Sequence, residues 1–312
     1  NGNLLMILSM ICMNLILNIL MSLVIMILRL IELIMVEITV ALIANGLPEK
    51  NSAIIAGIAG GGKNLNQINV DLIRNLKSVG NKVVLYHMGG ERFDKDISAY
   101  TECDLVIRNY YFSSILNNPE FNSKVIWAPN GFRTGVGPRQ GSALKKANSR
   151  QCLSAFLGWI NNSASYNNER TNFATPAAAC GENLYVMPSN GFAGGYNVGL
   201  YSAIMEDSIF APCPSGNNPE TIRLYDALEL GCIPISLSHE FLLSTDALAM
   251  IGPVPFPILG SWSELPQFLN EMKSKAISNP EEILALQQKC IDWWADFKIA
   301  ISQKITNRIV SL

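Results

Sequence analysis

Residues 211–237 read APCPSGNNPETIRLYDALELGCIPISL, and this stretch decides the fold. Its pattern predicts a strand that ends at Ala211, a loop of Pro, Gly and Asn, and a helix from about Pro219 to Gly231. A second strand follows at residues 233–237. Consecutive strands joined by a helix predict a parallel sheet. The loop then lies at the carboxyl edge of that sheet, where open α/β sheets bind their ligands.

Strands alternate with helices on both sides of this stretch. The alternation predicts an α/β fold of two Rossmann-like domains that face a cleft, joined by a linker rich in Gly, Ser and basic residues at 133–150. Further strands are expected at residues 53–59, 82–87, 104–107, 125–128, 153–157, 184–187 and 208–211, and further helices at 65–79 and 280–300.

The first 44 residues form a separate hydrophobic segment. Residues 4–28 carry no formal charge and, as a helix rising about 1.5 Å per residue, are long enough to span a bilayer. Leu, Ile, Met, Asn, Val and Ser make up almost all of residues 1–36, a composition equally typical of translated non-coding DNA. We therefore expect either an N-terminal hydrophobic helix that makes this a single-pass membrane protein, or a non-native segment and a cytoplasmic protein.

Composition excludes several classes of partner and site. The formal net charge is −2 and no long basic tract occurs, so no nucleic-acid partner is expected. With only two histidines, His87 and His239, a His-rich metal site is excluded. The seven cysteines are scattered without C-x-x-C spacing, which favours buried, reduced thiols over a zinc ribbon and leaves a disulfide between distant positions open.

The loop and helix of the deciding stretch carry the residues best suited to chemistry. They are Ser215, Gly216 and Asn217 in the loop, and Glu220, Arg223 and Asp226 on the helix. The loop residues precede free backbone N–H groups at the start of the helix, which suit a diphosphate. The helix residues are spaced by three and share a face. An arginine can pair with a phosphate and a carboxylate can accept ribose hydroxyls, but this spacing is equally typical of a surface ion-pair ladder.

Residues 214–235, PSGNNPETIRLYDALELGCIPI, resemble the donor-site signature of the exostosin-like glycosyltransferases. That signature is a Pro/Gly loop, an Arg, an acidic residue three positions later, then Ala-Leu and Gly-Cys-Ile-Pro. The NNPET run is most similar to the ribitol xylosyltransferase-like branch. Weaker similarity lies at 82–91 (KVVLYHMGGE), 104–111 (DLVIRNYY), 125–131 (VIWAPNG), 156–158 (FLG) with Arg170, and 290–298 (CIDWWADFK). Together these segments extend the resemblance over roughly residues 80–300, in the right order.

The resemblance implies a glycosyltransferase of the GT-B type, which moves a sugar from a nucleoside-diphosphate sugar, in particular a UDP-sugar, to a glycan or other hydroxyl acceptor. Enzymes of this kind are generally inverting and independent of metal, so no cofactor and no metal ligands are expected. Residues 45–149 would form the acceptor-side domain and residues 150–312 the nucleotide-sugar-binding domain. The resemblance assigns donor binding to Arg170, Ser215, Gly216, Asn217, Glu220, Thr221, Arg223 and Asp226, with Asp226 at the ribose and Arg170 and Arg223 at the diphosphate.

The catalytic base is expected in the first domain. Glu91 ends a predicted strand at the cleft and is the best candidate to deprotonate the acceptor, with His87 as the second. Arg108 and Asn109 belong to the Arg-Asn-Tyr strand of the resemblance and are expected on the acceptor side of the cleft.

Two departures from the family pattern and one rival motif leave alternatives open. Asp226 stands where the family usually has Glu, and Gly90 where it usually has Asp, so a catalytically inactive binding module with the same fold is one alternative. The other is a P-loop nucleotide-binding protein, because residues 57–63 (GIAGGGK) fit the G-x-x-x-x-G-K pattern. Asn64, however, lacks the hydroxyl that holds Mg²⁺ in such proteins.

Overall fold

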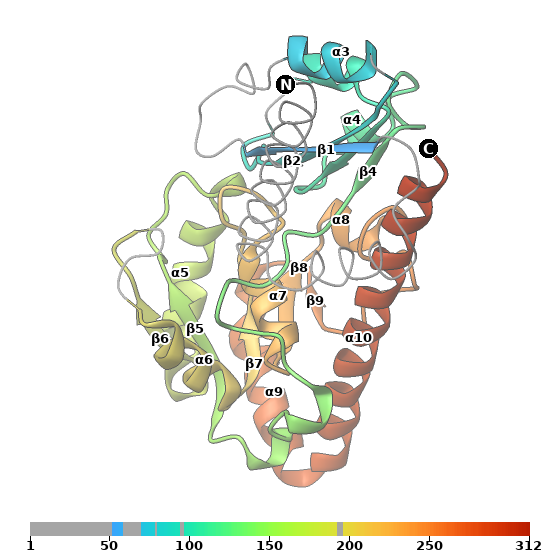
Figure 1. Cartoon of the computed structure of the whole chain (residues 1–312). Coiled ribbons are helices and arrows are strands. Elements are labelled where there is room, and N and C mark those ends of the chain that lie inside the picture. The colour runs from blue at the N-terminus through green and yellow to red at the C-terminus, as the bar shows by residue number, and fades with distance from the viewer. Residues whose placement is uncertain (1–51, 59–69, 79, 94–96, 192–195) are drawn as a thin grey trace, which may run out of the picture.

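The chain is built from two parallel α/β halves, one above the other in Figure 1. The computed structural model describes residues 52–58, 70–78, 80–93, 97–191 and 196–312. The predicted hydrophobic helix at 4–28 and most of the P-loop motif lie outside these described residues. Among the helices within them, none has the length and apolar character needed to cross a membrane.

The first half is a parallel sheet of four strands in the order β1-β2-β3-β4. Its strands are short apolar runs, and the third and fourth are buried along their whole length, as expected for a parallel sheet. The elements are β1 (Ser52–Ile58), α3 (Val70–Ser78), β2 (Lys82–Met88), β3 (Leu105–Arg108), α4 (Ser113–Leu116) and β4 (Val125–Trp127).

The second half is a parallel sheet of five strands in the order β6-β5-β7-β8-β9, with helices packed around it (Figure 1). Its strands are β5 (Cys152–Gly158), β6 (Tyr185–Pro188), β7 (Ser208–Pro212), β8 (Ile233–Leu237) and β9 (Ile258–Leu259). Its helices are α5 (Glu169–Ala179), α6 (Val198–Glu206), α7 (Ile222–Glu229), α8 (Glu240–Leu243), α9 (Leu265–Ser278) and α10 (Pro280–Val310).

Every strand predicted from the sequence is confirmed, with its ends within one residue of the prediction. The helices follow the prediction less closely. Helix α7 begins at Ile222, after Pro219 and Glu220, and α10 continues ten residues past the expected end at residue 300. Helices α5, α6 and α9 were not predicted, and α5 gives little helical pattern because Pro176 lies inside it.

Helix α10 joins the two halves. It runs the length of the second half and reaches the first sheet with its C-terminal turns (Figure 1). The ring of Phe297 on α10 lies 6.2 Å from that of Trp127 on β4, and Arg308 donates a hydrogen bond to the Ser123 carbonyl. The last helix of the sequence therefore buries apolar surface of both halves.

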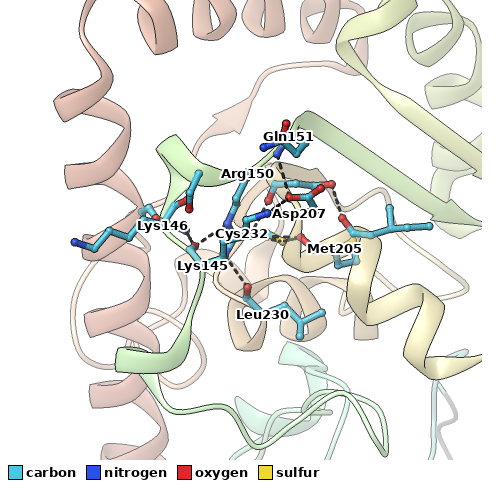
Figure 2. Close-up of polar contacts among 12 residues, drawn as sticks. Lys145, Lys146, Arg150, Gln151, Met205, Asp207, Leu230 and Cys232 are labelled. Atoms are coloured by element: carbon cyan, nitrogen blue, oxygen red, sulfur yellow. Dashed lines mark hydrogen bonds and ion pairs between the residues drawn. The ribbon is translucent and has the colours of Figure 1, made fainter.

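The linker at residues 133–150 is packed against the second half, as Figure 2 shows for its end. Arg150 is 6% exposed and donates to the carbonyls of Ser208 at 2.7 Å, Leu230 at 2.9 Å and Lys145 at 2.9 Å. Lys145 forms an ion pair with Asp207. One buried guanidinium thus fixes the linker to the strand and helix ends of the second half.

The Arg150 contacts can be tested by replacing this side chain with one of similar length and no charge. Arg150→Met leaves several buried carbonyls without donors, so we expect a loss of about 3 kcal/mol in the free energy of unfolding. The matched control is Lys146→Met, which changes an exposed neighbour and should cost less than about 0.5 kcal/mol. Urea unfolding measures both, and equal losses would contradict an anchoring role for Arg150.

Candidate functional site

A cleft of about 420 Å³ lies between the two halves, at the carboxyl ends of strands β5 and β7. Glu91, Tyr110 and Asn130 line it from the first half. Seven of the residues predicted from the sequence meet in this cleft, namely Glu91, Arg170, Gly216, Asn217, Glu220, Thr221 and Arg223. The edge of the sheet predicted to bind ligand is therefore a cavity that both halves shape.

Two buried arginines form the positively charged wall of the cleft. Arg170, from the first turn of α5, is 6% exposed, and Arg223, from the first turn of α7, is 5% exposed. Their guanidinium carbons lie 5.2 Å and 4.4 Å from the centre of the Phe156 ring. Within the part of the chain that the structure describes, neither guanidinium forms an ion pair with a carboxylate. Burial, and next the charge of Arg223, hold the pKa of Arg170 well below its usual range.

Backbone carbonyls hold the two guanidinium groups in place. Arg170 donates to the carbonyls of Ser215 at 2.7 Å and Trp159 at 3.2 Å, and Arg223 donates to that of Leu157. Gly158 lies directly beside the pair, because a Cβ added there would collide with the Arg223 guanidinium and come 3.8 Å from Arg170. The absence of a side chain at position 158 therefore lets both charges approach one point of the backbone.

Glu220 lines the cleft but uses its carboxylate to join the two halves. It is 1% exposed and accepts hydrogen bonds from the backbone N–H of Tyr111 and Asn130, the indole of Trp127 and the hydroxyl of Tyr225. All four distances lie between 2.7 and 2.9 Å. Burial raises the pKa of Glu220, although these donors counteract it. The start of α7 is thereby fixed to the first half.

Asp226 does not line the cleft in this structure, and the ribose-binding role expected for it stays a prediction. Its side chain is fully buried and accepts bonds from the Arg133 backbone at 2.9 Å, the Arg133 side chain at 2.7 Å and the Tyr201 hydroxyl at 3.0 Å. Burial raises the pKa of Asp226 while Arg133 lowers it. In this structure Arg133 lines the cleft instead and stacks on Tyr201.

Four more of the predicted residues do not line the cleft. His87 and Arg108 are register partners on neighbouring strands and are fully buried, with His87 Nδ1 2.5 Å from the Tyr100 hydroxyl. His87 thus lies away from the residues that line the cleft, and its role as the second candidate base stays a prediction. Asn109 accepts from the Gly89 N–H and donates to Asn130. The fourth residue, Ser215, is fully buried and directs its hydroxyl to another carboxylate, described below.

Tyr110 is a cleft residue that the sequence reasoning missed. Its backbone φ of 55° lies in the left-handed region, which is uncommon for a bulky residue and is often found at functional sites. Burial and the charge of Glu91 raise the pKa of its hydroxyl. The sequence predicts a strand at 104–107 and a resemblance that extends to residue 111, but a strained φ at Tyr110 leaves no mark in sequence. Arg133, Asn130 and Gly158 were missed too, because their roles depend on partners distant in the chain.

A second cavity of about 590 Å³ lies on the other side of the loop that follows β7. At its floor Glu169 is 4% exposed and accepts from the Ser215 backbone at 3.0 Å, the Ser215 hydroxyl at 2.5 Å and the Trp262 indole at 3.0 Å. His239 Nε2 lies 3.2 Å from the same carboxylate. Burial raises the pKa of Glu169, but the His239 and Ser215 contacts outweigh it and bring the pKa below its ordinary value.

The described residues contain neither a candidate metal site nor a disulfide. They include no group of three or more His, Cys, Asp and Glu side chains placed to hold a metal ion. The six cysteines within the described ranges are free, and five of them are buried, as the scattered spacing predicted. Cys12 lies outside the described residues.

Comparisons with known proteins identify relatives of the second half in particular. The family model of the RXYLT1 C-terminal domain matches residues 139–311, more than half of the chain. Ribitol-5-phosphate xylosyltransferase 1 of Homo sapiens is 27% identical over 124 residues, which are 36% of this chain and 27% of that protein. The Mus musculus protein of the same name is 29% identical over 110 residues, 32% of this chain and 24% of that protein. The chain thus spans about a quarter of the length of these curated relatives.

A solved structure matches both halves. An alpha-glucosyltransferase in complex with UDP and a 13-mer DNA containing a central A:G mismatch superposes with a TM-score of 0.51, covering 87% of this chain and 83% of that chain. At 11% sequence identity this likeness shows the fold alone. The predicted α/β fold of two parallel-sheet halves is therefore confirmed, and its architecture is that of GT-B glycosyltransferases.

The Glu169 cluster generates a prediction about pH. Since the pKa of Glu169 is lowered by folding, its contribution to stability is present above the unfolded pKa, about 4.3 for Glu, and is lost as the pH falls through the folded value. Glu169→Gln should lower the free energy of unfolding by about 2–4 kcal/mol at pH 7. This difference from wild type should shrink as the pH falls from 6 to 3.

Urea unfolding at a series of pH values measures the effect, with Glu120→Gln as the control at an exposed glutamate. If the free energies of unfolding of wild type and Glu169→Gln differ by the same amount from pH 6 to pH 3, a lowered pKa of Glu169 is contradicted.

Proposed function

Because the chain belongs to the family of the RXYLT1 C-terminal domain, we propose that it is a glycosyltransferase whose donor is a nucleoside-diphosphate sugar, in particular a UDP-sugar. The acceptor is a hydroxyl of a glycan or a related molecule, the transfer inverts the anomeric carbon, and no metal takes part. The family predicted from residues 214–235 is confirmed by the match, and the curated relatives are named as xylosyltransferases.

The pair Arg170 and Arg223 is the observation that carries the proposal. Two guanidinium groups buried without a carboxylate partner among the described residues make a site that is favourable for an anion. When the glycosidic bond of a nucleotide sugar breaks, negative charge develops on the leaving diphosphate. Donors fixed beforehand around that charge stabilise the transition state without reorganising. In this proposal the two arginines supply the positive charge that a metal ion supplies in other glycosyltransferases.

Glu91 supplies the base in the proposed mechanism. It lines the cleft from the first half and lies within a turn that is closed by a hydrogen bond from the Phe93 N–H to the Gly90 carbonyl at 2.8 Å. Glu91 takes the proton of the acceptor hydroxyl, whose oxygen then attacks the anomeric carbon. The bond from that carbon to the diphosphate breaks on the opposite face, and the released charge is met by Arg170 and Arg223.

Two alternatives to this proposal are an inactive binding module with the same fold and a P-loop nucleotide-binding protein. Gly90, which replaces the usual Asp, has a φ of 78° that glycine adopts at no steric cost, so the substitution fits the turn that presents Glu91. An inactive binding module would have the same cleft and differs only in turnover. Residues 59–63 of the P-loop motif lie outside the described residues, as does the possible membrane segment 4–28.

Donor binding is the first prediction of this proposal. UDP at 100 times its dissociation constant, without Mg²⁺, should stabilise the protein by about 2.7 kcal/mol in a thermal-shift assay. Arg223→Ala should weaken UDP at least tenfold, because one of the two charges facing the diphosphate is lost. Arg74→Ala, which removes an exposed arginine of the first half, is the control and should bind UDP as wild type does.

Two further variants guard against a simple folding defect. Gly158→Ala should weaken UDP more than Gly191→Ala, because only the first added methyl group collides with Arg223, whereas the second meets open space in the same cleft. Stabilisation by ATP with Mg²⁺ alone, lost in Lys63→Ala, would refute the proposal in favour of the P-loop.

Turnover is the second prediction and separates an enzyme from an inactive module. With water in place of the acceptor, the wild-type protein should release UDP slowly from at least one member of a panel of UDP-sugars. Glu91→Gln should lower this rate by a factor of about 10²–10⁴ and change the affinity for UDP less than threefold. Release at equal rates by both proteins would contradict Glu91 as the base, and UDP binding without any release would favour the inactive module.

A further inference from the structure

We propose that the second cavity binds a neutral carbohydrate segment of the acceptor and leads its hydroxyl to the donor cleft, an inference that rests on the proposed glycosyltransferase function. At about 590 Å³ the cavity lies within the range of small-molecule sites. It is separate from the cleft that holds the arginine pair, and none of the residues predicted to bind the donor lines it.

Aromatic rings make up the walls of the cavity. Phe93 from the first half and Tyr166 from the second are partly exposed, and their ring centres lie 5.7 Å apart. Trp262 and Phe241 are buried behind them, at 2% exposure each. The C–H faces of a sugar ring are apolar and its hydroxyls are polar, so a partly exposed ring flanked by polar groups suits it. Aromatic faces of this kind provide apolar contact area at little cost in conformational entropy.

Polar groups around the rings can accept and donate hydrogen bonds without carrying positive charge. Glu240 and Ser238 are exposed at one side of the cavity, and Asn167 at another. Among the described residues that line it, none is a lysine or an arginine, whereas Glu169 and Glu240 are carboxylates. The one other described lining group that can carry positive charge, the His239 imidazole, already faces the Glu169 carboxylate at 3.2 Å, so the described lining offers a phosphate or sulfate group no unpaired cation. The lining therefore favours a neutral ligand.

The cavity is held in one shape by its backbone and by the Glu169 cluster. Phe93 and Asn167 adopt φ values of 58° and 50°, and such strained positions persist only where the surrounding structure fixes them. Glu169 fixes Ser215 and Trp262 from beneath through short hydrogen bonds. A preformed shape reduces the conformational entropy lost when a ligand binds.

Asn218 connects the cavity to the donor cleft, because it lines both. Its side-chain amide donates to the Glu91 carbonyl at 3.0 Å, and its side-chain oxygen accepts from the Glu220 N–H at 2.9 Å. An acceptor chain lying against Tyr166 would thus pass Asn218 and present its end beside Glu91. This juxtaposition of an aromatic cavity, a shared asparagine and the proposed base makes the cavity an acceptor subsite.

The test is saturation-transfer NMR on the full chain, with xylobiose, cellobiose, lactose and maltose as neutral probes at 10 mM (roughly the Kd range of weak sites). Saturating UDP is present to fill the nucleotide part of the donor cleft. At least one probe should bind, and glucose should bind more tightly than glucose 6-phosphate. Tyr166→Leu and Glu240→Ala should each weaken the best probe, the first at least tenfold, while Tyr185→Leu, at an aromatic residue 46% exposed elsewhere, should not.

Several outcomes would overturn the inference. They are binding by none of the four probes, equal binding to Tyr166→Leu and wild type, or tighter binding of the phosphorylated sugar. Loss of probe binding in Arg223→Ala but not in Tyr166→Leu would place the sugar in the donor cleft. UDP binding without glycan binding refutes this inference alone, whereas glycan binding without UDP binding refutes the proposed donor and leaves the cavity a carbohydrate site.

Discussion

The burial of two like charges side by side is the constraint on which the cleft depends. A buried cation is costly unless polar groups surround it, and a second cation nearby adds repulsion. Carbonyl oxygens at the ends of β5 and β7 and the face of Phe156 offset part of this cost for Arg170 and Arg223. Within the described residues neither arginine forms an ion pair with a carboxylate, although the charge of Glu169 acts against the lowering of the Arg170 pKa, and the pair is favourable for an anion. Because both guanidinium groups are anchored to the backbone, they cannot turn away to solvent.

The buried carboxylates on or next to α7 do not line a charged site as the arginines do. Each of them joins this helix to another part of the chain. Glu220 binds the first half through two backbone N–H groups and Trp127. Asp226 binds Arg133 of the linker. Glu229 accepts from the Trp294 indole at 2.7 Å and from Lys298 at 3.1 Å, both on α10. The acidic residues of α7 therefore assemble the fold, and its arginine is left to face the cleft.

The different roles of these arginines and carboxylates explain how far the sequence could predict the site. Strands were readable because short apolar runs are bounded by turn residues, and the loop at 214–219 was readable from its Pro, Gly and Asn content. Arg170 and Arg223 were readable by residue type and resemblance. The contacts of Asp226 were not, because its partner Arg133 lies 93 positions away and only tertiary structure brings them together. The same holds for α10, whose last turns are fixed by contacts with the first half.

Asp226 also shows what its departure from the family pattern does physically. The carboxylate of Asp226 on α7 is fully buried and accepts hydrogen bonds from Arg133 and Tyr201, and Arg133 lines the cleft. In this structure Arg170 and Arg223 line the cleft, whereas the carboxylate of Asp226 faces Arg133 and Tyr201. For the proposed donor, the arginine pair would thus be the main anchor. The ribose of the donor would then have to contact other groups, or Arg133 would have to move. The Arg133 side chain is 29% exposed and that of Asp226 is fully buried, so Arg133 is the member of the ion pair with more room to move.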